Sequence, residues 1–272
     1  MVMISRSSGR LGNQLFQLAN TLNVRRPNQL VIFLGFSDAH SVLGHLAPNS
    51  IRIPVPNRLY HFAKKLFRKL QSSGWATTVT RGVQRSAQQH GRVPFLEVLD
   101  EQDCHYPSVL SGNDVLQRCL QLTKEIGEVD GRKKCFVHIR LGDYSSFLVG
   151  GSPVELPIEW YERQMELFRK SNPGTVFQVF SDEPAKVLER MVIQSDTEVV
   201  DADPKTSLTR MAACDMGILS ASTFSWWAAA AAHSAGKEGP FVAPAGWESW
   251  RTGVWSNPEK ITPWLLYRLV AS

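Results

Sequence analysis

The sequence has 272 residues, of which 43% are hydrophobic and 20% are charged, which excludes a chain that is disordered over most of its length. Thirty lysines and arginines against 25 acidic residues give a net charge of +5. This small excess favours an anionic ligand and disfavours a dedicated nucleic-acid binder. The four cysteines fit neither a zinc site nor a disulfide framework, so we expect buried, reduced thiols. Without an apolar run of roughly 20 residues or a secretion signal, a cytoplasmic protein is expected.

The N-terminal part of the chain predicts a βαβ unit. Met1–Arg6 is a candidate strand, and a glycine-containing turn follows at residues 9–12. The apolar residues of Asn13–Asn23 recur at helical spacing, and Leu30–Phe36 is typical of a buried parallel strand. The stretch up to residue 100 indicates little beyond a helix at Leu59–Gln71.

After Gly131 strands and helices alternate four times, which favours a parallel sheet with helices on both faces. The expected strands are Lys134–Ile139, Val176–Ser181, Glu198–Asp201 and Met216–Leu219. The expected helices are Ile158–Lys170, Pro184–Gln194, Ser207–Cys214 and Ser225–Ala235. The change of pattern predicts two domains, residues 1–130 and 131–272, and ligands bind at the carboxyl ends of strands in such folds.

The motif HIRLGDY, residues 138–144, directly follows the strand Lys134–Ile139. Arg140 offers a planar fork of donors at that strand end, which suits a diphosphate leaving group. The alternative is an arginine–aspartate pair that only holds the loop. The chain has neither the GxxxxGK[ST] nor the GxGxxG pattern, which disfavours ATPases and dehydrogenases.

A second motif, SASTFSWWAAAAA at residues 220–232, joins a strand to a helix. The hydroxyls of Ser222, Thr223 and Ser225 and the positive end of the helix dipole are suited to an anion. The structural alternative makes Thr223 or Ser225 a helix cap and places Trp226 and Trp227 in the core.

Two further motifs are weaker. In GRLGNQLFQLA, residues 9–19, Gly12 would let the backbone approach a ligand, and Asn13 both donates and accepts hydrogen bonds. In FSDE, residues 180–183, Ser181 or Asp182 is expected to cap the helix that starts at Pro184.

The segments GRLGNQLFQLA, HIRLGDY, FQVFSDE and CDMGILSASTFSWWAA occur in this order. Together they resemble the motifs of glycosyltransferase family 11, the α-1,2-fucosyltransferases, and more loosely those of the O-fucosyl and α-1,6-fucosyl enzymes. The resemblance implies a GT-B architecture, in which two Rossmann-like domains with parallel sheets face each other across a cleft. Residues 1–130 would form the acceptor-side domain and 131–272 the nucleotide-sugar-binding domain.

The resemblance also implies a reaction. Fucose would move from GDP-fucose to a glycan hydroxyl with inversion, without a bound metal or other cofactor. Arg140 would grip the departing β-phosphate, and Asp143 is the nearest motif carboxylate to take the acceptor's proton, with pairing to an arginine as its alternative and Glu155 and Glu159 as the next candidates. The residues expected at the donor are Gly12, Asn13, His138, Ser181, Asp182, Ser222, Thr223 and Ser225.

The sequence departs from the family pattern at two positions. Leu141 replaces the second arginine of the motif, which halves the positive charge there. Ser207 stands where related enzymes have an aspartate for the guanine edge, and a serine cannot offer guanine a bidentate carboxylate.

Two rival functions start from other residues. Asp201 and Asp203 resemble the metal-binding D-x-D of a GT-A glycosyltransferase, although a turn before Pro204 explains them without metal. A non-catalytic carbohydrate-binding protein would use tryptophans near the C-terminus, which also suit a core; these are Trp247, Trp250, Trp255 and Trp264.

The segment Tyr60–Gln71 predicts a helix with one apolar and one basic face. Such a helix can lie on an anionic membrane surface, here the inner surface, where the lipid-linked acceptors of bacterial family members would be found. The alternative is an ordinary domain helix with solvated lysines.

Overall fold

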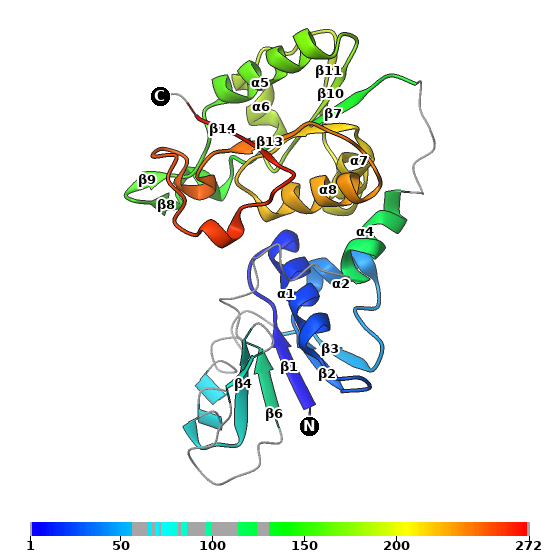
Figure 1. Cartoon of the computed structure of the whole chain (residues 1–272), viewed down its shortest axis with the longest axis vertical. Helices are drawn as coiled ribbons and strands as arrows, with labels where there is room; N and C mark the ends of the chain where they lie inside the picture. Colours follow the sequence, from blue (N-terminus) through cyan, green and yellow to red (C-terminus); the bar gives the residue numbers. More distant parts are fainter. Residues whose placement is uncertain are drawn as a thin grey trace. The chain divides into compact units, whose positions relative to one another are not determined.

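The computed structural model describes residues 2–55, 65–66, 69–70, 72–80, 83–85, 96–99, 114–123 and 131–270. The chain forms two compact units, Met1–Val115 and Leu116–Ser272, and Figure 1 follows the chain through both. The division lies inside helix α4 (Asp114–Thr123). The predicted boundary near residue 130 falls after this helix, next to residues outside the described ranges.

The first unit contains a six-stranded sheet in the order β3-β2-β1-β6-β4-β5, in which only the β4–β5 pair is antiparallel among the described strands. The parallel pairing of β1 with β2, in which Ile4 lies opposite Ile32, confirms the predicted βαβ unit. The strands are β1 (Val2–Arg6), β2 (Val31–Leu34), β3 (Ser50–Ile53), β4 (Ala76–Thr80), β5 (Val83–Arg85) and β6 (Leu96–Leu99).

Helices α1 (Leu11–Val24) and α2 (Ser37–Leu43) connect the first three strands. Helix α1 begins at Leu11 rather than Asn13, and it buries Leu15, Phe16 and Leu18 in the core. Full burial of each such side chain contributes about 1.5–3 kcal/mol, which explains why apolar spacing alone located this helix.

The second unit contains a parallel sheet in the order β11-β10-β7-β12-β13-β14. Taken in chain order this is 3-2-1-4-5-6, the doubly wound order, and it reverses between β7 and β12. The strands are β7 (Lys134–Ile139), β10 (Val176–Ser181), β11 (Thr197–Val200), β12 (Met216–Ile218), β13 (Phe241–Pro244) and β14 (Leu266–Arg268), with a separate hairpin of β8 (Leu148–Val149) and β9 (Ser152–Pro153).

Helices cover both faces of this second sheet, with α5 and α6 on one side and α7 and α8 on the other (Figure 1). All four predicted helices are present, although α6 ends at Arg190 and α7 and α8 begin earlier than expected. The helices are α5 (Ile158–Ser171), α6 (Pro184–Arg190), α7 (Pro204–Ala213) and α8 (Thr223–Ser234), and the 3₁₀ turns are η4 (Asp143–Ser145), η5 (Trp247–Ser249) and η6 (Pro258–Lys260).

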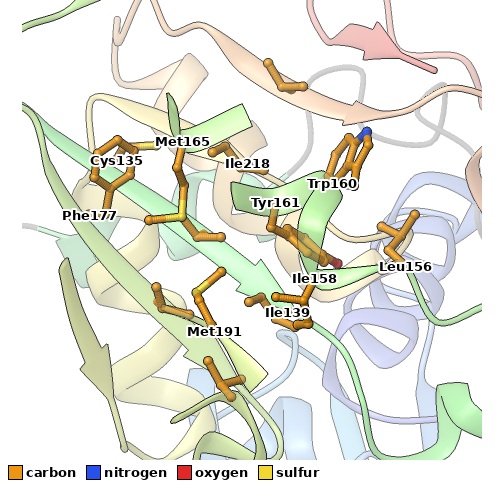
Figure 2. Close-up of a cluster of buried hydrophobic side chains, with 14 of the residues drawn as sticks. Cys135, Ile139, Leu156, Ile158, Trp160, Tyr161, Met165, Phe177, Met191 and Ile218 are labelled. Atoms are coloured by element: carbon orange, nitrogen blue, oxygen red, sulfur yellow. The ribbon is translucent and has the colours of Figure 1, made fainter. Parts of the chain in front are cut away.

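One core cluster of the second unit lies between its sheet and the helices α5 and α6. Figure 2 shows Ile158 and Tyr161 of α5 beside Ile139 of β7. Cys135 is buried in the same cluster, and burial raises the pKa of its thiol well above the usual range. The expectation of buried, free thiols is confirmed for the described cysteines, which are Cys119, Cys135 and Cys214, while Cys104 lies outside the described residues.

No helix among the described residues is long and apolar enough to cross a membrane. The segment Tyr60–Gln71, for which a basic helix face is predicted, lies largely outside those residues. Within it Leu70 is helical and packs against the apolar cluster of the first unit, so the surface-binding prediction is not tested.

Candidate active site

The loops after β7 and β12 lie at neighbouring strand ends. These two strands pair in parallel, with Ile218 opposite Val137, so their carboxyl ends meet at the same edge of the sheet. The strand order reverses between them. In doubly wound folds ligands bind at such a reversal, and here the two strongest sequence motifs follow the two strands between which it occurs.

Two side chains tie these loops together. Nδ1 of His138 lies 2.7 Å from Oγ of Ser220, and the Tyr144 hydroxyl donates a hydrogen bond of 2.8 Å to the carbonyl oxygen of Ala221. Burial raises the pKa of the Tyr144 hydroxyl well above its usual range, so it remains a donor. The two motifs therefore form one connected structure.

Arg140 is held by charged and aromatic partners on several sides. Its Nη2 lies 2.7 Å from Oδ1 of Asp143, and its Nη1 lies 3.2 Å from Oδ2 of Asp182. The guanidinium carbon lies 5.4 Å from the centre of the Tyr144 ring. These contacts confirm the alternative in which an arginine–aspartate pair holds the loop. The side chain is still 13% exposed, so these contacts also orient a cation at the strand end.

His138 is buried on β7 beside this arginine. Burial, helped by the nearby Arg140 charge and opposed by Asp182, lowers the pKa of its imidazole to about 3. The ring is therefore neutral at physiological pH. It lies 5.5 Å from the ring of Phe224 in the first turn of α8, so its position depends on both loops.

The start of α8 is capped by Ser222, whose Oγ accepts the backbone N–H of Phe224 at 3.3 Å. The prediction that Thr223 or Ser225 supplies the cap is wrong, because the helix begins at Thr223. Ser225 is fully buried and donates its hydroxyl to the Ser222 carbonyl oxygen at 3.1 Å. Its side chain thus stabilises the loop from within.

The core alternative is confirmed for Trp226 and Trp227, which are both buried. The indole N–H of Trp226 donates to Oγ1 of Thr262 at 2.8 Å. These two tryptophans anchor α8, so the helix start is a fixed feature of the site.

The segment after β10 behaves differently from its prediction. The residue before α6 is Glu183, which makes no side-chain cap, so Asp182 does not cap this helix. Its Oδ1 instead accepts the backbone N–H of Leu141 at 3.0 Å. Ser181 uses its Oγ to accept the N–H of Glu183. Asp182 therefore holds the Arg140 loop, although it follows a different strand, β10.

In the first unit the motif at residues 9–19 forms the turn after β1 and the start of α1. Gly9 has a left-handed conformation with φ of +68°, and a side chain there would collide with Asn13. Gly12 was expected in the turn but lies inside the helix. Asn13 lies in the same first helical turn.

Two glutamines of this motif, which the sequence motifs did not single out, hold the turn after β1. Gln17 accepts the N–H of Ser8 at 2.9 Å and donates to its carbonyl oxygen at 3.1 Å. Gln14 donates to the Gly9 carbonyl oxygen and accepts the N–H groups of the first turn of α2, at Asp38 and Ala39. Polar residues at the helical spacing of the buried positions of α1 are the signal that would have found them.

The two departures from the family pattern have local explanations. Leu141 is buried in the core cluster of the second unit, so this position serves packing. Ser207 lies on α7 and donates its hydroxyl to the Ala202 carbonyl oxygen at 3.2 Å.

The carboxylates proposed for a metal are engaged differently. Asp203 caps α7 by accepting the N–H groups of Lys205 and Thr206, so it ends the segment before Pro204 as a helix cap and not as a separate turn. Among the described residues no group of three or more histidines, cysteines, aspartates and glutamates could hold a metal ion.

The tryptophans that suggested a lectin pack within the protein. Trp250 is buried and donates its indole N–H to the Val154 carbonyl oxygen at 3.0 Å. Trp264 stacks on His233 with ring centres 4.7 Å apart. Trp247 is also buried. The aromatic faces needed for sugar stacking are largely used in these contacts.

The solved structures with a similar fold include a glycosyltransferase. The heptosyltransferase WaaC of E. coli with ADP-2-deoxy-2-fluoro heptose has 12% sequence identity, and the match covers 98% of this chain and 93% of that chain at a TM-score of 0.54. The same enzyme with ADP matches over 89% and 87% at 0.50. The expected GT-B class of fold, with parallel α/β units, is confirmed.

The α-1,6-fucosyltransferase NodZ soaked with GDP-fucose matches at 13% identity over 84% of this chain and 91% of that chain, with a TM-score of 0.41; the same enzyme is described from Bradyrhizobium. No protein of curated function matches by sequence. The model of glycosyl transferase family 11 matches residues 110–250, which is more than half of the 272 residues and includes Arg140, Asp182 and Ser222. The chain therefore belongs to glycosyltransferase family 11.

Proposed function

We propose that this glycosyltransferase moves fucose from GDP-fucose to a glycan hydroxyl, with inversion at the anomeric carbon and formation of an α-1,2 linkage. The observation that supports it most is the placement of Arg140 and the start of α8 at adjacent strand ends, where the strand order reverses. Both features favour a diphosphate. The motif resemblance supports fucose and guanosine as the other parts of the donor.

In this proposal the reaction is a single in-line displacement. The acceptor oxygen bonds to C1 of fucose while the bond from C1 to the β-phosphate oxygen breaks, and GDP leaves with the electron pair. Negative charge develops on the β-phosphate, close to Arg140 and the N–H groups at the start of α8. One such preorganised donor typically contributes a hundred- to a thousandfold in rate.

His138 has a positioning role in this scheme. Its ring is neutral and bonded to Ser220, so it holds the two loops together without adding charge. With Leu141 in the core, Arg140 supplies the formal positive charge of the HIRLGDY motif. The proposed site therefore depends on one guanidinium more strongly than the family pattern would.

The proton of the acceptor hydroxyl needs a base. Asp143 is proposed for this role because it is the carboxylate of the HIRLGDY motif and is more than half exposed, although its ion pair with Arg140 also fits the pairing alternative. Of the other candidates, Glu155 pairs with Arg190 at 2.7 Å, and Glu159 is exposed in the first turn of α5. If Asp143→Asn keeps both transfer and the acidic limb of the pH–rate profile, the base lies elsewhere.

A donor screen tests the proposal. GDP-fucose, GDP-mannose, UDP-galactose and an ADP-sugar are each incubated with the protein, and the free nucleotide is measured. We expect release from GDP-fucose, and a screen in which only a UDP- or ADP-sugar reacts would overturn the donor assignment. A parallel series with a chelator tests the metal-dependent alternative, and the protein with Arg140→Lys is the matched control.

The acceptor and linkage need a second measurement. Glycans ending in galactose are offered with GDP-fucose, and the product linkage is determined by NMR. An α-1,2 product supports the full proposal. Donor hydrolysis with no transfer to any glycan would contradict the acceptor class while leaving the donor assignment intact.

A further inference from the structure

The two carboxylates that hold Arg140 differ in exposure. Asp182, which contacts Nη1, is 14% exposed, whereas Asp143, which contacts Nη2, is 57% exposed. One partner of the guanidinium is therefore part of the protein interior and the other lies at the surface.

The loop is built closely around Asp182. Its Oδ1 accepts the N–H of Leu141 while its Oδ2 faces Arg140. A Cβ atom at Gly142 would collide with that same Oδ2. Glycine is thus required at this position for Asp182 to approach the backbone. Three consecutive residues, 140 to 142, depend on one carboxylate.

Asp143 has a weaker hold on the arginine. It lies at the start of the η4 turn, three residues from Arg140, and its contact is an exposed ion pair. Exposed pairs typically contribute between nothing and about 1 kcal/mol. Breaking this contact therefore costs the protein little.

The difference in exposure between the two carboxylates matters for the binding of an anionic ligand. One guanidinium between two carboxylates leaves the cluster with a net negative charge, which repels a diphosphate. Displacement of the exposed carboxylate would remove this repulsion and free Nη2 for a phosphate oxygen. The buried carboxylate can remain and keep the fork oriented.

We propose that Asp143 occupies the edge of Arg140 that the donor's phosphate takes, and that it swings away when a diphosphate binds, whereas Asp182 is a positioning residue that stays. The proposal rests on the proposed function in that the ligand is a diphosphate. In this proposal Asp143 weakens the binding of a diphosphate to Arg140, whereas Asp182 strengthens it.

The experiment compares Asp143→Asn with Asp182→Asn by titration calorimetry against inorganic pyrophosphate and GDP. We expect Asp143→Asn to bind both ligands about threefold more tightly, the size typical of an exposed ion pair, and this gain should shrink at high salt. We expect Asp182→Asn to bind them at least tenfold more weakly, because the fork loses its orientation. An asparagine at 182 still accepts the Leu141 N–H, which isolates the effect of the charge.

The matched control is Asp196→Asn. Asp196 also pairs with an arginine, since Arg169 contacts its two oxygens at 2.8 and 2.9 Å. This pair lies at the end of α5 and before β11, at the opposite edge of the sheet. Its removal should leave ligand affinity unchanged.

Several outcomes would overturn the proposal. An unchanged or weaker affinity of Asp143→Asn would exclude displacement, and tighter binding by Asp182→Asn would exclude positioning. If Asp182→Asn does not fold, Gly142→Ala takes its place, since the added methyl displaces the same carboxylate.

Pyrophosphate separates this proposal from the donor assignment because it contains neither base nor sugar. Binding of pyrophosphate with the expected pattern but no binding of GDP would overturn the guanosine donor alone. Binding of GDP without any change in Asp143→Asn would overturn the displacement alone. If pyrophosphate binds neither the native protein nor Asp143→Asn, the displacement is also excluded.

Discussion

The two units hold the loop after their first strand by different means. In the first unit the loop after β1 is fixed by amides, since Gln17 bonds both backbone groups of Ser8 and Gln14 bonds Gly9. In the second unit the loop after β7 is fixed by charge, with Arg140 paired to Asp143 and Asp182. Both loops follow a central parallel strand.

The uncharged contacts of the first loop fix its conformation, whereas the charged contacts of the second loop also affect how it binds an anionic ligand. Neutral amides form hydrogen bonds with the backbone without adding a net charge. We therefore expect the stability of the first loop to be insensitive to salt and pH. A cation between carboxylates remains available to an anionic ligand, but it is screened by salt and depends on the charge balance around it. We therefore expect changes in the first loop to affect folding and changes in the second to affect turnover.

The largest effect is expected for Arg140→Lys. An ammonium keeps the charge but cannot form two parallel N–H bonds to a phosphate. Activity should fall about a hundred- to a thousandfold, or about 2.7–4 kcal/mol in activation free energy, with little change in unfolding. Steady-state kinetics and urea unfolding of the same preparation measure both quantities. Near-normal turnover by a folded Arg140→Lys protein would remove Arg140 from the mechanism.

The second prediction is that Gln17→Leu destabilises the loop after β1. This change removes both hydrogen bonds that the buried Gln17 amide makes to the backbone of the exposed Ser8, and each such hydrogen bond typically contributes about 0.5–1.5 kcal/mol. We expect the free energy of unfolding to fall by about 1–3 kcal/mol, to a similar extent at low and high salt. The matched control is the exposed Gln194→Leu, which should change stability by less than about 0.5 kcal/mol. Equal effects of the two substitutions would show that Gln17 does not hold the loop.

His138 gives the second loop a pH dependence. The folded imidazole stays neutral because its pKa is lowered to about 3, whereas an unfolded histidine protonates near pH 6.5. Below pH 6.5 the unfolded state binds more protons, so stability falls as the pH falls. At pH 5 the loss from this residue is about 2 kcal/mol.

Urea unfolding at pH 7.5 and pH 5 tests this prediction. The difference between the two pH values should be smaller in His138→Gln than in the native protein by about that amount. The control is the exposed His40→Gln in the first unit, which should leave the difference as it is. An unchanged difference in His138→Gln would mean that the imidazole protonates without penalty in the folded protein.

The smallest effect is expected at the helix cap of α8. Ser222→Ala removes the side-chain acceptor for the Phe224 N–H and should lower stability by about 1 kcal/mol. Ser222→Asp keeps a cap, so its stability should be close to native, but its charge should weaken pyrophosphate binding. Calorimetric titration of both variants separates the two functions of this position. Native affinity in Ser222→Asp would place the diphosphate away from the start of α8.

The sequence determined the elements whose signals are local. Apolar runs placed β7 and β10 to the residue, and helical spacing placed α1 and α5, because burial of one face is repeated within each segment. The starts of α7 and α8 were placed too late because Asp203 and Ser222, which cap them, were not identified as caps. Strands β3 to β6, β13 and β14 were missed, since they are short and depend on pairing with distant strands.

The motifs likewise located Arg140 and Ser222 at strand ends without any structure. Only the tertiary structure decided which groups surround them. Strand β10 pairs with β7 so that Ser181 lies opposite Ile139. This register brings Asp182 to Arg140 and to the N–H of Leu141, which is 41 positions away in the sequence. Strand order and register arise from contacts between segments far apart in the chain, and no local pattern in either segment specifies its neighbour. The sequence therefore located the cation and the serine-rich loop before α8, and the pairing of strands decided which carboxylate orients that cation.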